Sequence, residues 1–180
     1  MACIPYVVFK LKLISPQRYA DTIFCWCLKG ISPHNLDVLI QKWVLEDLPF
    51  RLRRPAKGLV HALKDNGYTP VLLSANFDIL VHPIGRELGI SESICTTTCI
   101  GNSSNRRAVS KVVRGIQKKV EIIARFDIEI LRNSIGVGNE PADMAFLSAL
   151  GGGSLIHGDD DLQKIIDTLS TVPTVPHLHN

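Results

Sequence analysis

The feature that most constrains the fold is an alternation of short apolar runs with amphipathic stretches, which begins near Gly58. The run Val71–Leu73 has the continuous apolar character of a strand that is buried on both faces. A stretch with apolar residues at spacings of three and four follows it and ends at Gly89, as an amphipathic helix does. Because such alternation is typical of a layered α/β domain, we expect helices packed on a sheet of buried strands.

The same patterns divide the rest of the chain into elements. We expect further strands over 94–100, 134–137 and 154–156, and further helices from Pro55, over 117–126, from Pro141 and around 162–169. Pro83 lies inside the helix that ends at Gly89, so a kink or a late helix start is expected there. The glycines at 151–153 are expected to break the chain.

The first 50 residues follow a different pattern. Two helical stretches, over 20–28 and 35–48, precede the α/β alternation, and Ser32 and Pro33 are good start signals for the second of them. Two consecutive helices ahead of the first buried strand predict an accessory helical lobe.

Composition narrows the class of protein. The chain has 180 residues, 46% hydrophobic and 21% charged, which is ordinary for a globular domain, and its net charge of +3 permits an anionic ligand without favouring nucleic acid. Five cysteines, an odd number, indicate reduced thiols and a cytoplasmic location. Lysines at 10 and 12 interrupt the apolar N-terminus where a signal peptide keeps charge out, and no apolar run reaches transmembrane length.

Polar residues stand where the predicted elements meet. Ser74, with Ala75 and Asn76, follows the first buried strand. Open α/β sheets bind ligands at this edge, and the N-terminus of the next helix offers unpaired N–H groups to a phosphate. Lys118 and Lys119 lie at the start of a later helix, where a cation interacts unfavourably with the helix dipole. A lysine at this position is explained if its ammonium group binds an anion such as phosphate. When each position is taken alone, simpler explanations exist. Ser74 could cap the following helix, and the two lysines could belong to a solvated basic face.

A third polar position is the loop after the strand expected at 134–137. Asn139 and Asp143 are four residues apart there, just before a helix, and oxygen ligands at a strand's end suit Mg²⁺. Capping of the following helix by either side chain is the alternative explanation.

The order and spacing of the three positions resemble motifs II, III and IV of the haloacid dehalogenase (HAD) superfamily, most closely its phosphoserine-phosphatase-like branch. The similarity rests on Leu72–Asn76, Gly115–Val120 and Gly138–Leu147, and it extends over about residues 16–170. It implies a three-layer HAD-like (Rossmannoid) fold with a parallel sheet and a small helical cap. The implied domains are an N-terminal segment with a reduced cap over 1–52, an α/β core over 53–172, and a flexible tail over 173–180.

The resemblance also implies a Mg²⁺-dependent phosphomonoester hydrolase acting on a small phosphorylated metabolite. Ser74 would hydrogen-bond the transferring phosphoryl group, and Lys119 would neutralise its charge, with Lys118 as the alternative one position earlier. Ala75 and Asn76 would complete the phosphate site. Mg²⁺ would be held by Asn139 and Asp143.

One family motif has no counterpart in the chain. The family's nucleophile is the first Asp of an Asp-x-Asp-x-Thr motif, but no Asp-x-Asp precedes Ser74 and the first aspartate is Asp21. Either Val7–Leu13 is the old nucleophile strand with Lys10 and Lys12 in place of both aspartates, or that strand lay upstream of the given sequence. The second explanation is favoured, because the sequence after Lys12 looks like cap sequence of this branch.

Both explanations predict little or no turnover by this chain, and the main alternative is a non-catalytic module that binds phosphate or a partner. The nucleophile strand is central in this fold, so its loss leaves neighbouring strands unpaired, and the apolar run Ile4–Phe9 is expected to fill the gap.

Two rival functions are weaker. A zinc site would use Cys25, Cys27, Cys95 and Cys99, but the one-residue gap in the first pair fits zinc poorly. A nucleic-acid site would use the basic stretches 51–57 and 106–119, which have no aromatic residues interleaved with their charges. We therefore expect no nucleic-acid partner and no membrane partner.

Overall fold

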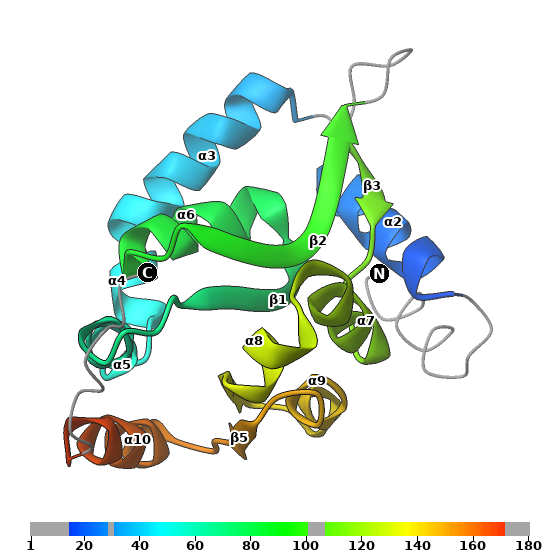
Figure 1. Cartoon of the computed structure of the whole chain (residues 1–180). Helices are drawn as coiled ribbons and strands as arrows, with labels where there is room; N and C mark the ends of the chain where they lie inside the picture. The colour runs from blue at the N-terminus through cyan, green and yellow to red at the C-terminus, as the bar shows by residue number, and fades with distance from the viewer. Residues whose placement is uncertain (1–14, 29–30, 101–106, 172–180) are drawn as a thin grey trace, which may run out of the picture.

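The computed structural model of the chain describes residues 15–28, 31–100 and 107–171 (Figure 1). The predictions made for Ile4–Phe9, Lys10, Lys12 and the tail at 173–180 fall outside these ranges.

The described residues form helices and strands in alternation after an N-terminal group of helices. The helices are α2 (Pro16–Cys27), α3 (Pro33–Glu46), α4 (Leu48–Arg51), α5 (Ala56–Asp65), α6 (Asp78–Leu88), α7 (Ile116–Arg125), α8 (Ile128–Arg132), the 3₁₀ turn η1 (Pro141–Asp143), α9 (Met144–Leu147) and α10 (Asp159–Thr171). The strands are β1 (Val71–Phe77), β2 (Glu92–Ile100), β3 (Arg107–Lys111), β4 (Ile135–Gly138) and β5 (Gly152–Leu155).

Most of the expected elements are confirmed, with two corrections. The glycine run at 151–153 does not break the chain, since Gly152 and Gly153 lie in β5. A Cβ on Gly153 would come within 3.0 Å of the Leu147 side chain, so the missing side chains let β5 pack closely on α9. The late start considered for α6 is also wrong, because the helix begins at Asp78 and includes the buried Pro83.

The strands form two separate sheets. In the first, β1 pairs in parallel with β2, with Ser74 opposite Cys95, and β2 pairs antiparallel with β3. In the second, β4 pairs in parallel with β5. The α/β class with parallel pairing is therefore confirmed, whereas the antiparallel β3 and the division of the sheet were not anticipated.

Helices cover both faces of β1 and connect the two sheets (Figure 1). On one face α6 contacts β1 and β2; on the other, α7 contacts both strands and also α9, which packs on β4 and β5. The core between them consists of Ile94, Val113, Ile122, Leu131, Phe146 and Leu147, with Val71 and Leu73 of β1 packed against it. The two sheets thus share one hydrophobic core.

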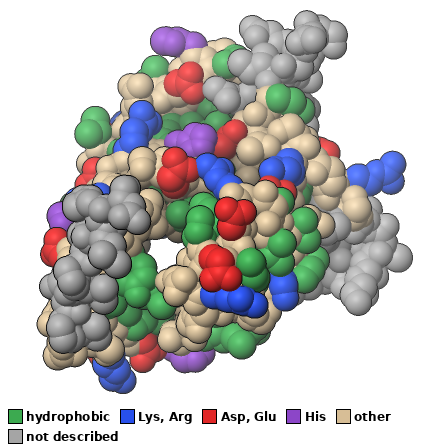
Figure 2. Space-filling view, in the orientation of Figure 1, with side chains coloured by type: hydrophobic (Ala, Val, Ile, Leu, Met, Phe, Trp, Pro, Cys, Tyr) green, Lys and Arg blue, Asp and Glu red, His purple; other side chains and the backbone are tan. Residues whose placement is uncertain are grey.

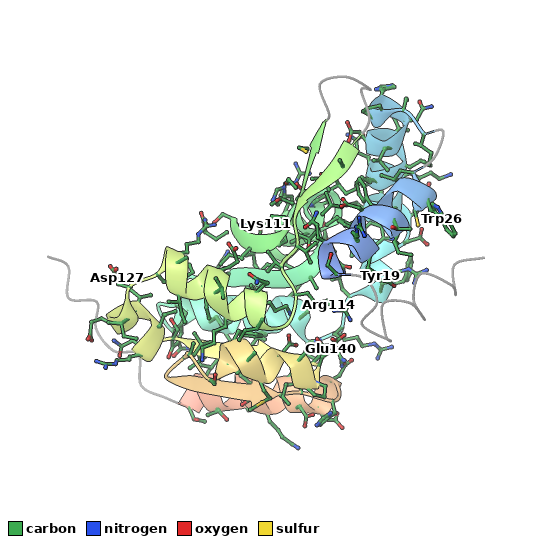
Figure 3. All side chains as sticks on the ribbon, turned by 90° about the vertical axis from the view of Figure 1, so that its right-hand side faces the viewer. Tyr19, Trp26, Lys111, Arg114, Asp127 and Glu140 are labelled. Carbon is green, nitrogen blue, oxygen red and sulfur yellow. The ribbon has the colours of Figure 1, made fainter. Side chains whose placement is uncertain are left out.

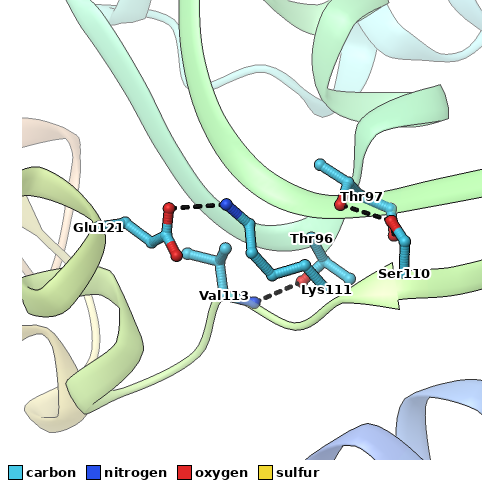
Figure 4. Close-up of polar contacts among 6 residues, drawn as sticks. All are labelled: Thr96, Thr97, Ser110, Lys111, Val113 and Glu121. Carbon is cyan, nitrogen blue, oxygen red and sulfur yellow. Dashed lines mark hydrogen bonds and ion pairs between the residues drawn. The ribbon is translucent and has the colours of Figure 1, made fainter. Parts of the chain in front are cut away.

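A buried hydroxyl holds the crossing between β1, β2 and the segment before α7 (Figure 4). The side chain of Thr96 is 1% exposed; it donates to the Ala75 carbonyl oxygen at 2.9 Å and accepts from the Val113 amide at 3.1 Å. At the protein surface nearby, Lys111 pairs with Glu121 of α7 at 2.7 Å. These contacts fix the start of α7 against the carboxyl-terminal half of β1.

The predicted N-terminal helices are present, and the first of them lies along the outer strand β3. In α2, the Gln17 side chain donates to the Val109 carbonyl oxygen at 2.9 Å, and Asp21 accepts from the Val109 amide at 3.2 Å. The ring of Phe24 in α2 packs against the ring of Phe77 at the end of β1, with ring centres 4.6 Å apart and ring planes tilted by 55°. For α3, Ser32 is the N-cap residue as expected, accepting from the Asn35 amide. Within the described residues, no helix is long and apolar enough to cross a membrane.

Candidate functional site

The candidate site lies where β1 and β4 end and α7 begins. Ser74 is inside β1 rather than after it, because the strand continues to Phe77. The Ser74 hydroxyl accepts from the Asn76 amide at 3.1 Å, while Ala75 and Asn76 are exposed. The N-cap residue of α6 is Phe77, which has no capping side chain, so the explanation of Ser74 as a helix cap is wrong.

A buried ion pair is the strongest polar contact of the site. The Lys118 ammonium lies 2.6 Å from Asp143 Oδ1, and the two side chains are only 12% and 5% exposed. The same ammonium stands 5.6 Å above the centre of the Phe146 ring, a cation–π distance. Because Lys118 is in the first turn of α7 and Asp143 follows β4, the pair joins the helix that covers β1 to the second sheet.

The second carboxylate oxygen of Asp143 organises the loop after β4. It accepts from the amides of Asn139 at 3.0 Å and Glu140 at 3.1 Å, which folds the loop around the carboxylate. A Cβ on Gly138 would lie 2.6 Å from the Asp143 Cβ, so only glycine leaves room for this approach. Asp143 therefore acts as the anchor of the loop.

These contacts shift the pKa of Asp143. Burial by itself would raise it, but the hydrogen bonds from Lys118 and from the amides of Asn139 and Glu140 outweigh burial, so the pKa of Asp143 lies below its ordinary value. A carboxyl whose folded-state pKa is depressed contributes stability above its unfolded-state pKa, and that stability is lost as pH falls through the folded-state pKa.

We therefore expect the wild-type chain to lose more stability between neutral pH and pH about 3 than the Asp143→Asn variant does, since the ordinary pKa of an aspartate is about 3.9. Urea unfolding of both proteins across that range measures the difference. Asp159, which is exposed and contacts Arg53, supplies the matched control Asp159→Asn, whose pH profile should follow the wild type. Identical profiles for all three proteins would contradict the assignment.

The two candidate lysines point to different places. The Lys119 ammonium contacts the Ser148 hydroxyl at 3.2 Å, on the exposed side of α9, whereas Lys118 lies with Asp143 and the Asn139 loop. The N-cap residue of α7 is Gly115, in a conformation with φ 54° and ψ −122°, and this turn sets which lysine faces the loop. The geometry thus favours Lys118, and not Lys119, as the lysine that would neutralise the charge of a phosphoryl group.

The described residues fit a magnesium ion poorly. Both Asp143 oxygens already accept hydrogen bonds, one of them from a cation, and Glu140 forms a capping box with Asp143. No group of three or more His, Cys, Asp or Glu side chains with metal-binding geometry occurs in the described part of the chain. Asn139, a neutral and exposed side chain, then supplies a single amide oxygen, which is too small a ligand set for Mg²⁺.

Two residues at this end of the molecule were not predicted as site residues from the sequence. Arg114 precedes α7 and Glu140 follows β4, and both lie at the end of the sheet where α7 starts (Figure 3). Arg114 was assigned only to a basic stretch, because nothing in its sequence neighbourhood sets it apart from Arg106, Arg107 and Lys111. A charge pattern alone cannot show which of several basic side chains faces a neighbouring loop.

Comparison with known proteins decides the family. A model of the haloacid dehalogenase-like hydrolases matches residues 18–148. The chain belongs to this family. The resemblance read from its three motifs is thereby confirmed, and those motifs lie within or at the border of the matched region. A search of curated proteins returns no match.

Solved structures agree with this fold at low sequence identity. A protein of unknown function from Bordetella pertussis Tohama I superposes with a TM-score of 0.69 and 15% identity, covering 92% of this chain and 77% of that one. A probable phosphoserine phosphatase from Vibrio cholerae, in its unliganded form, gives 0.51 and 18% identity, covering 90% of this chain and 53% of that one. The chain of this HAD hydrolase thus spans about half the length of the Vibrio structure.

Proposed function

We propose that this HAD hydrolase chain binds the phosphate group of a small phosphorylated metabolite at the carboxyl-terminal edge of β1. The observation that carries the proposal is the buried Lys118–Asp143 pair, which holds an ammonium group at the strand ends. An ammonium has three N–H donors, so the Lys118 side chain can donate to a phosphate oxygen while it keeps its hydrogen bond to Asp143. The Ser74 hydroxyl and the exposed residues Ala75 and Asn76 would complete the phosphate site at the end of β1.

By lineage this is a phosphomonoester hydrolase site, but we infer little or no turnover by the chain itself. Phosphoryl transfer in this family needs a carboxylate nucleophile, and no Asp-x-Asp precedes Ser74. Lysine at 10 and 12 supplies neither a carboxylate nucleophile nor a metal ligand. The domain boundaries, the cytoplasmic location and the lack of a nucleic-acid partner stay predictions, whereas the magnesium site predicted at Asn139 and Asp143 does not fit the contacts that Asp143 already makes.

Titration with inorganic phosphate, followed by amide chemical shifts, tests binding. We expect shifts at residues 74–76 and at 118, and an affinity about 5-fold lower in Ser74→Ala, which is about 1 kcal/mol for one hydrogen bond to an anion. Ser148→Ala is the matched control, because its hydroxyl meets Lys119 outside the site, and it should bind phosphate like the wild type. Equal affinity in Ser74→Ala and wild type would contradict the assignment.

Hydrolysis of p-nitrophenyl phosphate, with and without Mg²⁺, tests turnover. We expect no rate above that of the buffer. A Mg²⁺-dependent rate that Ser74→Ala abolishes and Ser148→Ala keeps would show an active phosphatase instead, and would require a nucleophile that the sequence analysis did not find.

A further inference from the structure

Two residues of β1 have no partner opposite them on β2. Ser74 lies opposite Cys95. Phe77 lies opposite the very next residue of β2, Thr96, so residues 75–76 are extra and form a bulge in the strand. Both residues of the bulge are exposed and belong to the phosphate site proposed above. A bulge interrupts the ladder of backbone hydrogen bonds, so other groups must fix its conformation.

A buried hydroxyl holds the bulge from the interior of the protein. Thr96 is 1% exposed, and its hydroxyl donates to the Ala75 carbonyl oxygen at 2.9 Å. This bond supplies the bulge with a partner that the interrupted ladder does not provide. From within β1, the Ser74 hydroxyl accepts from the Asn76 amide at 3.1 Å. Two hydroxyl groups therefore hold the bulge, and one of them is itself a predicted phosphate ligand.

The same threonine hydroxyl is bonded to the segment that leads into α7. It accepts from the Val113 amide at 3.1 Å (Figure 4), and Val113 itself is 0% exposed, in the hydrophobic core. A hydroxyl can donate one hydrogen bond and accept another at the same time. Residues 114–115 separate Val113 from α7, whose first turn carries Lys118. One oxygen atom of Thr96 therefore connects the bulge of β1 to the segment that positions Lys118.

The two threonines that follow in β2 have other partners. Thr97 makes a hydroxyl contact with Ser110 of β3 at 2.8 Å, at the protein surface. The amide and the hydroxyl of Thr98 donate to the Asp78 carboxylate at 2.9 and 2.7 Å, which fixes the start of α6. Within the described residues, Thr96 is thus the threonine of this run that contacts both the bulge and the segment before α7.

Fixed positions matter at this site because the surface charge is mixed. Lys and Arg side chains are intermingled with Asp and Glu side chains over the face of the molecule shown in Figure 2. An anion gains little from such a surface at a distance, since neighbouring charges of opposite sign cancel. Its affinity then depends on hydrogen-bond donors that are already held in the right places.

We propose that Thr96 is a positioning residue of the phosphate site, whose hydroxyl fixes the bulge at Ala75 and Asn76 relative to Lys118 and thereby sets the affinity for phosphate. The effect on affinity rests on the function proposed above, whereas the effect on geometry exists without a ligand. The two parts are therefore tested separately.

Thr96→Val tests the geometry in the ligand-free protein. Valine keeps the shape of threonine but leaves the Ala75 carbonyl and the Val113 amide without a partner. We expect the Val113 amide to exchange its hydrogen about 10-fold faster or more, and the amide signals of both Asn76 and Lys118 to shift. Thr96→Ser, which keeps the hydroxyl, should restore the wild-type exchange and signals. Unchanged signals of Asn76 and Lys118 in Thr96→Val would overturn the proposal.

Titration with inorganic phosphate tests the effect on affinity. We expect the affinity to fall at least about 5-fold in Thr96→Val and to stay within about 2-fold of the wild type in Thr96→Ser. Thr96→Ala removes the same hydroxyl without placing a methyl group against the two backbone groups, and it should lose affinity in the same direction.

Two controls separate positioning from stability. Thr97→Val makes the same change at the neighbouring surface hydroxyl and should bind phosphate like the wild type. Leu162→Ala creates a cavity at a residue that is 4% exposed in α10, so it should lower stability but keep the affinity. Equal affinity in Thr96→Val and wild type, or an equal loss in Leu162→Ala, would overturn the proposal. If the wild type binds no phosphate, the proposed function is wrong, and the ligand-free comparison alone decides whether Thr96 fixes the geometry.

Discussion

Replacement of Lys118 by methionine is expected to lower the free energy of unfolding by about 3–5 kcal/mol, the cost of leaving one partner of a buried ion pair uncompensated. Methionine keeps most of the apolar stem that packs near Phe146, but it removes the ammonium that lies 2.6 Å from Asp143. The Asp143 carboxylate would keep its two backbone hydrogen bonds and lose its counter-ion while remaining buried. Urea or guanidinium denaturation followed by circular dichroism measures the change.

The neighbouring lysine is the matched control. Lys119→Met removes an exposed hydrogen bond to Ser148, so we expect a change of no more than about 0.5 kcal/mol. The double variant Lys118→Met/Asp143→Asn should recover part of the loss, because it no longer buries an unpaired charge. A similar small effect for both lysines would show that the ion pair does not hold the β4 loop to α7.

Replacement of Gly151 by alanine is expected to lower the free energy of unfolding by about 3 kcal/mol, at the upper end of overpacking effects. The added Cβ would overlap the backbone carbonyl of Arg132, at the end of α8, and a backbone group cannot turn aside as a flexible side chain can. The Gly151 amide also donates to the Leu131 carbonyl oxygen at 2.9 Å, so the chain cannot shift without losing that bond. Thermal or chemical denaturation measures the loss.

Gly158→Ala provides the comparison for this prediction. Nothing lies within 4 Å of a Cβ at this position and its backbone is not left-handed, so alanine should be neutral or slightly stabilising. If both alanine variants were equally stable, the close approach of residue 151 to α8 would not exist in solution.

The sequence by itself determined the family and most of the alternating helices and strands, but not β3 or α8. A continuous apolar run located β1, and apolar periodicity located α6, α7 and the final helix, because burial on a helix face imposes a fixed spacing on apolar residues. The start of α3 followed from Ser32 and Pro33, since capping depends on neighbours in the chain. The spacing of Ser74, the lysine pair and Asn139 pointed to the HAD hydrolases without any coordinates.

Which residues meet in space was decided by the tertiary structure. The lysine that faces Asp143 depends on the turn at Gly115 and on the distance between α7 and β4, two quantities that local sequence does not contain. The extension of β1 through Ser74 depends on its pairing with β2, and the division of the described strands into two sheets depends on which strands pair with one another. Local patterns record the periodicity of burial, whereas contacts between distant segments depend on how the whole chain packs.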